Sequence, residues 1–178
     1  MGAGKTTELI KAYDIYKRKK LEPIVIKPSI DDREGKFQGW GTTQSRITKE
    51  IIPAFYYTNI EEIKNLTFNS IFIDEAQFCS KKDVRYLCEL VDTKDIPLLA
   101  YGLKTDVNGD LFEGAGAWLA LADETMELEN LCQYPGCNKK AIAHARYING
   151  VKDNSGQSVV IDKGDITYKS VCRKHWRE

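Results

Sequence analysis

The sequence predicts an α/β fold, a parallel sheet with flanking helices, followed by a small C-terminal domain built around a metal site. Three observations indicate this. Short apolar segments alternate with amphipathic ones through the first part of the chain. A glycine-rich loop opens the first amphipathic segment, and two pairs of metal-ligand residues stand near the carboxyl end. We therefore expect two domains, residues 1–130 and residues 131–178.

The composition indicates a globular protein with one sizeable core. The chain has 178 residues, and Lys plus Arg and Asp plus Glu both number 26. A net charge of zero gives no electrostatic drive toward nucleic acid or a membrane surface. No apolar run approaches the roughly 20 residues that span a bilayer, and the amino terminus does not resemble a signal peptide. We expect a cytoplasmic protein that binds neither nucleic acid nor membrane.

The amino terminus carries part of a phosphate-binding motif. Gly4-Lys5-Thr6 matches the end of G-x-x-x-x-G-K-[ST], whose backbone N–H groups surround phosphates at the start of a helix. Lys5 would reach the β- and γ-phosphates, and the Thr6 hydroxyl would bind Mg²⁺. The motif's first glycine and the strand before it do not occur, so we interpret the sequence as beginning inside the motif. The predicted ATP-binding residues here are Met1, Gly2, Ala3, Gly4, Lys5 and Thr6.

Helical and strand periodicities follow in alternation. Helices are predicted at residues 6–20, 80–91 and 115–122, with one or two helical turns at 60–65. Strands are predicted at residues 22–28, 54–57, 70–74, 97–102 and 124–128. Residues 34–45 have no clear periodicity and are predicted to be a mobile loop. Residues 101–114 follow a strand and contain three glycines, so we expect them to run over the ligand-binding edge of the sheet.

An acidic pair ends the strand predicted at residues 70–74. Asp74 and Glu75 follow a buried apolar run, so they would emerge at the carboxyl end of the strand, where open α/β sheets bind ligands. Successive strand side chains point to opposite faces, so one acid could serve a metal ion and the other a substrate proton. Taken alone, such a pair more often marks a solvated strand end, and its context decides between the two interpretations.

The carboxyl end contains a predicted structural zinc site. The spacings C-x4-C and C-x2-H, about 35 residues apart, suit tetrahedral Zn²⁺ bound by Cys132, Cys137, Cys172 and His175. Cys79 and Cys88 occupy ordinary core or helix positions, so a disulfide framework is not expected. Between the ligand pairs we predict strands at 141–148 and 158–161, a turn-rich segment at 149–157 and a flexible segment at 162–168. His144 is expected to line the fold.

Four features in order resemble one family. Gly4-Lys5-Thr6, the segment Asp74-Glu75-Ala76-Gln77-Phe78, residues 101–106 and the zinc-ligand pairs together resemble the cytosolic-type (type II) thymidine kinases, in particular their bacterial and phage branch. The resemblance covers nearly the whole chain. It implies a P-loop NTPase-like sheet, a C-terminal zinc ribbon that pins a lasso loop over the nucleoside, and a homotetramer. It also implies ATP-dependent phosphorylation of the thymidine 5′-hydroxyl to thymidine monophosphate, for DNA synthesis.

The resemblance also implies roles for individual residues. Asp74 would be the Mg²⁺ carboxylate and Glu75 the catalytic base, with Ala76 and Gln77 on the ATP side. The substrate residues would be Asp31, Arg33, Phe78, Val160, Ile161 and Tyr168. Deoxyuridine is a second candidate substrate, and thymidine triphosphate would act as feedback inhibitor. The family's Ile-Gly-Gly in the lasso appears here as residues 161–164, Ile-Asp-Lys-Gly.

Two other classes of protein share some of these motifs. A P-loop ATPase or switch protein has the phosphate loop and the acidic pair, but it does not need a lid over a nucleoside. A zinc ribbon can bind nucleic acid, but this one lacks a basic stripe with interleaved aromatic residues. The nucleoside kinase is therefore the favoured interpretation.

Overall fold

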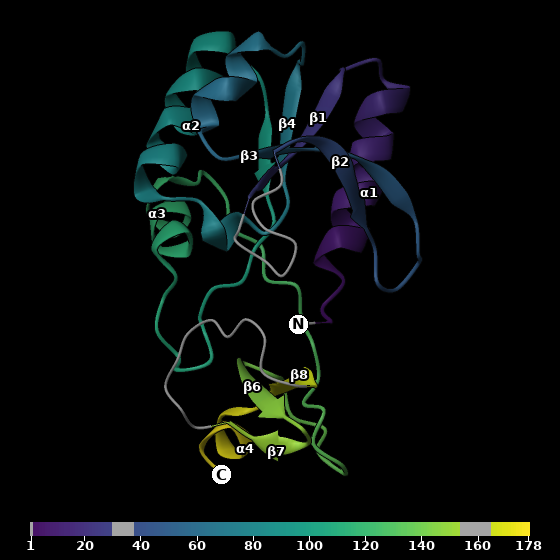
Figure 1. The fold of residues 1–178 in the computed structure, drawn as a ribbon, viewed down its shortest axis with the longest axis vertical. Coiled ribbons are helices and arrows are strands. Elements are labelled where there is room, and N and C mark those ends of the chain that lie inside the picture. Colours follow the sequence, from purple (N-terminus) through teal and green to yellow (C-terminus); the bar gives the residue numbers. More distant parts are fainter. Residues whose placement is uncertain (1, 30–37, 154–164) are drawn as a thin grey trace.

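The computed structural model describes residues 2–29, 38–153 and 165–178 (Figure 1). Its larger part is a five-stranded sheet in the order β2-β3-β1-β4-β5, with helices on both faces, which confirms the predicted α/β fold. The elements of this part are α1 (Lys5–Arg18), β1 (Pro23–Pro28), β2 (Gly39–Gln44), β3 (Ile51–Tyr57), the 3₁₀ helix η1 (Ile60–Asn65), β4 (Ser70–Ile73), the 3₁₀ helix η2 (Ala76–Phe78), α2 (Lys81–Lys94), β5 (Leu98–Ala100) and α3 (Glu113–Leu121).

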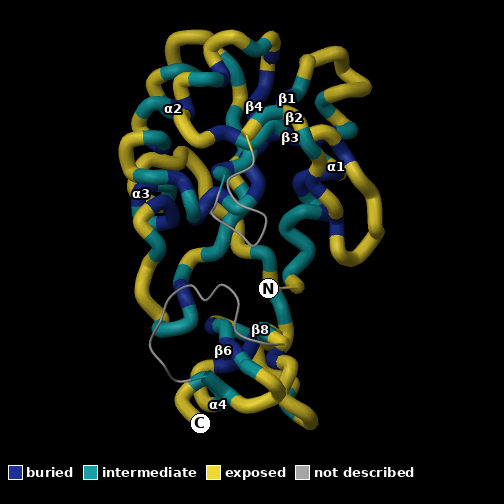
Figure 2. The backbone as a smooth tube through the Cα atoms, viewed as in Figure 1, coloured by how far each residue is buried: buried dark blue, intermediate teal, exposed yellow. Residues whose placement is uncertain are grey.

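Strand β4 lies inside the sheet and is buried along its whole length (Figure 2). Because alternate side chains point to opposite faces, Ile71 and Ile73 pack in the core on the side of α2 and α3. Phe72 packs on the other side against α1, where Tyr13 and Tyr16 meet its ring edge to face. Both faces of β4 are therefore covered, as the continuous apolar run predicts.

Helix α2 begins at a capping box. The Ser80 hydroxyl accepts a hydrogen bond from the backbone N–H of Asp83, and the Asp83 carboxylate accepts one from the backbone N–H of Ser80, at 3.1 and 2.9 Å. The two bonds satisfy donors that the first helical turn leaves free. The helix therefore begins within one residue of the predicted start.

The carboxyl-terminal part forms a separate small sheet. Its strands β6 (Ala143–Ile148), β7 (Val151–Lys152) and β8 (Ile166–Val171) pair antiparallel in the order β7-β6-β8, and α4 (Arg173–Arg177) ends the chain. Arg146 is almost fully buried here, and its guanidinium pairs with Asp153 at 2.6 Å. A buried charge needs such a partner.

The prediction that residues 34–45 form a loop was wrong for its described second half. Gly39–Gln44 is strand β2, which pairs antiparallel with residues 51–56 of β3, while β1, β3, β4 and β5 run parallel to one another. Residues 39–44, Gly-Trp-Gly-Thr-Thr-Gln, contain two glycines, and their sequence lacks the regular alternation of apolar and polar side chains that marks a strand. Cross-strand hydrogen bonds to β3, which the local sequence does not encode, make it a strand.

Two further predictions about secondary structure were wrong. Residues 124–128 are not a strand; four of these five side chains are exposed, and no sheet edge pairs with them. Residues 166–168, predicted to be flexible, belong to β8, and residues 151–152 in the predicted turn form β7. The strand predicted at 158–161 lies outside the described residues. In the segments that the structure describes, no helix is long and apolar enough to cross a membrane.

Helix α3 approaches η2 closely at Gly114. A Cβ atom added to Gly114 would lie 2.4 Å from the carbonyl oxygen of Cys79, whereas one added to Gly116 would meet nothing within 4 Å. We predict that Gly114→Ala lowers the free energy of unfolding by about 1–3 kcal/mol through overpacking. Gly116→Ala should raise it by about 0.5–1 kcal/mol, because alanine favours the helix. Urea unfolding of both variants tests this, and equal effects would contradict the close packing.

Candidate active site and zinc centre

The Asp74 carboxylate lies at the carboxyl end of β4 and is only 2% exposed. Its Oδ1 atom accepts hydrogen bonds from the backbone N–H of Glu75 at 3.1 Å and from the Thr6 hydroxyl at 3.4 Å. Its Oδ2 atom accepts one from the Thr43 hydroxyl at 2.6 Å, and the Lys27 ammonium lies 3.8 Å away. The buried charge is therefore met by donors from α1, β1 and β2.

Glu75 adopts an unusual backbone conformation. Its φ is 54°, in the left-handed region, which costs energy for a residue with a side chain. The Gln77 side chain donates a hydrogen bond to the Glu75 carboxylate at 2.7 Å and accepts one from the backbone N–H of Leu103 at 3.0 Å. Gln77 is buried, so it fixes Glu75 relative to the segment that follows β5. Glu75 itself stays half-buried beside Asp74.

The glycine-rich start of the chain leads directly into α1. Gly4 has a φ of 75°, and its carbonyl accepts the hydrogen bond of Glu8 that begins the helix. Lys5 and Thr6 therefore lie in the first turn, at the positive end of the helix dipole. The hydroxyl of Thr7 is hydrogen-bonded to that of Ser45, 2.8 Å away, at the end of β2. This is the geometry of an anion-binding helix start.

The segment after β5 lies against η2, at the carboxyl edge of the parallel strands. A Cβ atom on Gly102 would lie 2.9 Å from the backbone nitrogen of Gln77, so a larger residue does not fit there. Asp106, which is buried, accepts hydrogen bonds from the backbone N–H groups of residues 108 and 110 and shapes the loop. At the end of the loop, the ring of Phe112 meets that of Phe78 edge to face at 5.6 Å.

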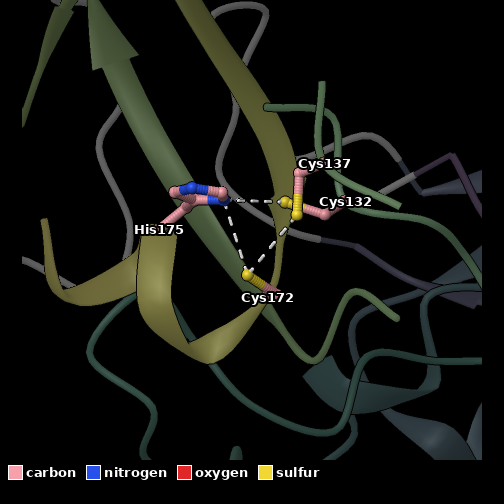
Figure 3. A group of neighbouring side chains, drawn as sticks. All are labelled: Cys132, Cys137, Cys172 and His175. Carbon is pink, nitrogen blue, oxygen red and sulfur yellow. Dashed lines mark hydrogen bonds between the residues drawn. The ribbon is translucent and has the colours of Figure 1, made fainter. Parts of the chain in front are cut away.

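The four predicted zinc ligands come together (Figure 3). The His175 Nδ1 atom lies 3.4 Å from the Cys132 sulfur and 3.5 Å from the Cys172 sulfur, and the Cys137 and Cys172 sulfurs are 4.0 Å apart. Zinc–sulfur bonds of about 2.3 Å and zinc–nitrogen bonds of about 2.0 Å place neighbouring ligand atoms of a tetrahedron roughly 3.5–3.8 Å apart. The cluster fits a zinc ion, and a full set of protein ligands makes the site structural.

Local geometry and charge also favour a cation at this cluster. Pro135 and Gly136 form a tight turn, in which Gly136 has a φ of 74°. The turn lets the backbone N–H of Cys137 donate a hydrogen bond to the carbonyl of Tyr134. The Tyr134 ring stacks on that of His175 at 3.8 Å. A backbone N–H of Lys139 lowers the pKa of the Cys137 thiol, but burial and the two neighbouring sulfurs raise it more. A bound cation would stabilise the Cys137 thiolate that these neighbours otherwise disfavour.

A tryptophan beside the zinc ligands connects the small sheet to the larger part of the protein. The indole N–H of Trp176 donates to the carbonyl of Val107 at 2.9 Å, and its ring covers Gly109, where an added Cβ atom would lie 2.9 Å from it. Lys152 on β7 donates to the Trp176 carbonyl at 2.7 Å. Helix α4 therefore holds the loop that ends at Phe112.

The structure brings together some of the predicted site residues. Thr6, Asp74 and Glu75 are neighbours, as are the four zinc ligands. Tyr168 lies half-buried on β8, opposite Arg146. Met1, Asp31, Arg33, Val160 and Ile161 lie outside the described residues.

Sequence reasoning missed Thr43, Lys27 and Phe112. Lys27 ends a predicted strand next to β4, so its position at the ligand edge was a usable signal. Thr43 carried no such signal, because it lies in the segment interpreted as a loop.

Comparison with known proteins decides the family. The thymidine kinase family model matches residues 1–176. The thymidine kinase of Enterobacteria phage T4 is 38% identical over 184 residues, covering 100% of this chain and 92% of the phage protein. The chain belongs to the thymidine kinase family. Thymidine kinases of Shewanella oneidensis and Lactiplantibacillus plantarum are 38% and 35% identical, and this chain covers 93% and 91% of their lengths.

The predicted likeness to bacterial and phage thymidine kinases is confirmed, and the protein is a thymidine kinase. Thymidine as substrate and ATP as phosphoryl donor are what membership of a kinase family implies.

Zinc binding can be tested by removing one ligand. We predict that Cys137→Ser lowers the zinc content from about one ion per chain to near zero, because a structural zinc needs all four ligands. Its thermal unfolding should begin at a lower temperature, since the zinc ligands hold the small sheet together. Elemental analysis of the purified protein measures the metal. Cys88→Ser, on α2 outside the cluster, is the control, and an equal zinc loss there would contradict the assignment.

His144 makes the stability of the fold depend on pH. It lines the fold on β6, outside the Cys₃His cluster as predicted, and burial lowers its pKa from 6.5 to about 4, with the positive charge of Lys5 adding to the shift. Between these values the unfolded chain takes up a proton that the folded chain does not, so the free energy of unfolding falls as pH falls through this window.

We predict that His144→Gln reduces this loss of stability. Urea midpoints at about pH 7.5 and about pH 5.5 should differ less in the variant than in the wild type. The other ionisable groups are the same in both proteins, so their effect cancels in the comparison. Equal pH dependence in the two proteins would show that His144 is not the cause.

Proposed function

We propose that the site around Asp74 and Glu75 transfers the γ-phosphoryl group of ATP to the 5′-hydroxyl of thymidine. The observation that carries this proposal is the meeting of the α1 amino end and the Asp74–Glu75 pair at one edge of the sheet, with Thr6 hydrogen-bonded to Asp74. Phosphoryl transfer needs positioning, neutralisation of phosphate charge and one proton acceptor. The three residues at this edge, with Lys5, supply these functions.

Thr6 and Asp74 form a pair of oxygen ligands that suits Mg²⁺. The Thr6 hydroxyl and Asp74 Oδ1 lie 3.4 Å apart, and Mg²⁺ prefers hydroxyl, carboxylate and phosphate oxygens. When bound, the ion would neutralise charge on the phosphates. Lys5, in the first turn of α1, would hold the β- and γ-phosphates, and the backbone of residues 1–4 would surround them.

Glu75 is the proposed general base. It is half-buried next to Asp74, and the hydrogen bond from Gln77 holds one of its carboxylate oxygens, leaving the other for the substrate hydroxyl. The strained φ of 54° turns the chain between the two acids and supports separate roles for them. Glu75 would take the proton of the 5′-hydroxyl as that oxygen attacks phosphorus.

The base of the nucleoside is proposed to lie against Phe78, with Phe112 beside it. Further proposed contacts, from the family resemblance, are Asp31, Arg33, Val160, Ile161 and Tyr168 for the nucleoside and Met1, Gly2, Ala3, Ala76 and Gln77 for ATP. The hydrogen bonds of Gln77 to Glu75 and Leu103 also support a role for Gln77 in positioning Glu75, the proposed general base.

The family resemblance extends the proposal to regulation and assembly. We propose that deoxyuridine is also accepted, that thymidine triphosphate inhibits, and that the enzyme is a cytoplasmic homotetramer. We also propose that the nucleotide-binding domain ends at residue 130 and that residues 131–178 form the zinc-binding lasso domain. A pure ATPase would have no need of this second domain.

The role of Glu75 predicts a specific kinetic defect. Glu75→Gln should lower kcat for thymidine by about 10²–10⁴-fold and leave KM nearly unchanged, because the amide keeps the shape of the side chain but cannot accept the proton. Glu89→Gln makes the same chemical change on an exposed face of α2 and should have no effect. Initial rates with ATP and each of thymidine, deoxyuridine, deoxycytidine, deoxyadenosine and deoxyguanosine give kcat and KM for the wild type and both variants.

Two outcomes would contradict this proposal. Thymidine turnover that survives Glu75→Gln nearly unchanged would remove Glu75 from the role of base. ATP hydrolysis by the wild type without phosphorylation of any nucleoside would indicate an ATPase instead.

A further inference from the structure

Strand β2 brings a second hydroxyl group to the Asp74 carboxylate. The Thr43 hydroxyl donates to Oδ2 at 2.6 Å, which is shorter than the 3.4 Å between the Thr6 hydroxyl and Oδ1. Thr43 is 3% exposed and Asp74 is 2% exposed, so water does not replace this bond easily. The phosphate motif accounts for Thr6 at this carboxylate but not for Thr43.

The position of Thr43 is a property of the hairpin formed by β2 and β3. In the sheet order two strands, β3 and β1, separate β2 from β4 (Figure 1), yet Thr43 contacts the residue that ends β4. The hairpin must therefore bend back over the carboxyl edge of the sheet. Within β2, residues 42 and 44 are exposed and only Thr43 is fully buried, so the strand directs this one hydroxyl into the site.

The end of the same hairpin is fixed against the start of α1. The Ser45 hydroxyl, fully buried, meets that of Thr7 at 2.8 Å and accepts hydrogen bonds from the backbone N–H groups of Ile47 and Thr48 at 3.2 and 3.0 Å. The Ile47 side chain lies 3.5 Å from the position that a Cβ atom on Gly4 would take. The hairpin therefore contacts both the phosphate loop and Asp74.

We propose that Thr43 is a positioning residue for the metal-binding carboxylate. It holds Oδ2, together with the charge of Lys27 at 3.8 Å, and so keeps Oδ1 turned toward the Thr6 hydroxyl. A carboxylate with one oxygen fixed in this way presents the other to a metal ion at a smaller entropic cost. This inference rests on the proposed role of Asp74 and Thr6 in binding Mg²⁺.

The test compares three threonine variants. Thr43→Val keeps the shape and removes the donor, Thr43→Ser keeps the donor, and Thr42→Val makes the same change at the exposed neighbour. We expect Thr43→Val to raise the free Mg²⁺ concentration needed for half-maximal rate by about 10–100-fold, the range seen when groups that orient metal ligands are removed. The KM for thymidine should not change. Thr43→Ser and Thr42→Val should resemble the wild type.

A second measurement does not depend on turnover. Mg²⁺ added with ATP should raise the thermal unfolding temperature of the wild type and of Thr42→Val above that with ATP alone, and this increment should shrink in Thr43→Val. Circular dichroism of the variants without ligand shows whether each is folded.

The outcomes separate this inference from the proposed function. If Thr43→Val lowers the unliganded unfolding temperature and kcat but leaves the Mg²⁺ dependence unchanged, Thr43 has only a structural role and the inference is wrong. If Asp74→Asn also leaves the Mg²⁺ dependence unchanged, the proposed metal site itself is wrong. A defect in Asp74→Asn with none in Thr43→Val would overturn only the role of Thr43.

Discussion

The buried negative charge of Asp74 is the constraint on which the arrangement of the larger part depends. A carboxylate that is 2% exposed is costly unless hydrogen bonds or cations compensate it. The compensating groups come from three elements, α1, β1 and β2, in addition to the adjacent backbone. Each element therefore has one end, the amino end for α1, at the carboxyl edge of β4. This convergence places the Thr6 hydroxyl and the Asp74 carboxylate together at the amino end of α1, where we propose that Mg²⁺ and phosphate bind.

The proposed general base and the proposed nucleoside contacts are joined to Asp74 by short connections. Glu75 follows it with a left-handed turn, and Gln77 ties Glu75 to the segment after β5. That segment leads to Phe112, whose ring contacts Phe78. Trp176, beside the zinc ligands, holds the middle of the same segment from the small sheet. The Cys₃His cluster is thus connected to the segment that carries Phe112.

Much of the active site and the zinc centre was predictable because the signals are local. The apolar run before Asp74 specifies a buried strand, and the acidic pair marks its end. The predicted zinc ligands lie in pairs, five and three positions apart along the chain, and Pro135-Gly136 specifies the turn between the first two. Predictions failed where a local pattern conflicts with long-range pairing. Polar and apolar residues alternate over residues 125–128, but this segment joins no sheet, while residues 39–44 contain two glycines and still pair with β3.

The sequence by itself determined the family, the alternation of helices and strands, the acidic pair and the four zinc ligands, because each depends on neighbours along the chain. Only the tertiary structure decided that the β2–β3 hairpin bends over the site, that Thr43 and Lys27 contact Asp74, and that Trp176 binds the loop at Val107. These contacts join residues 31 to 69 positions apart. They form because a buried charge and an indole N–H need partners, and the folded chain places those partners within reach.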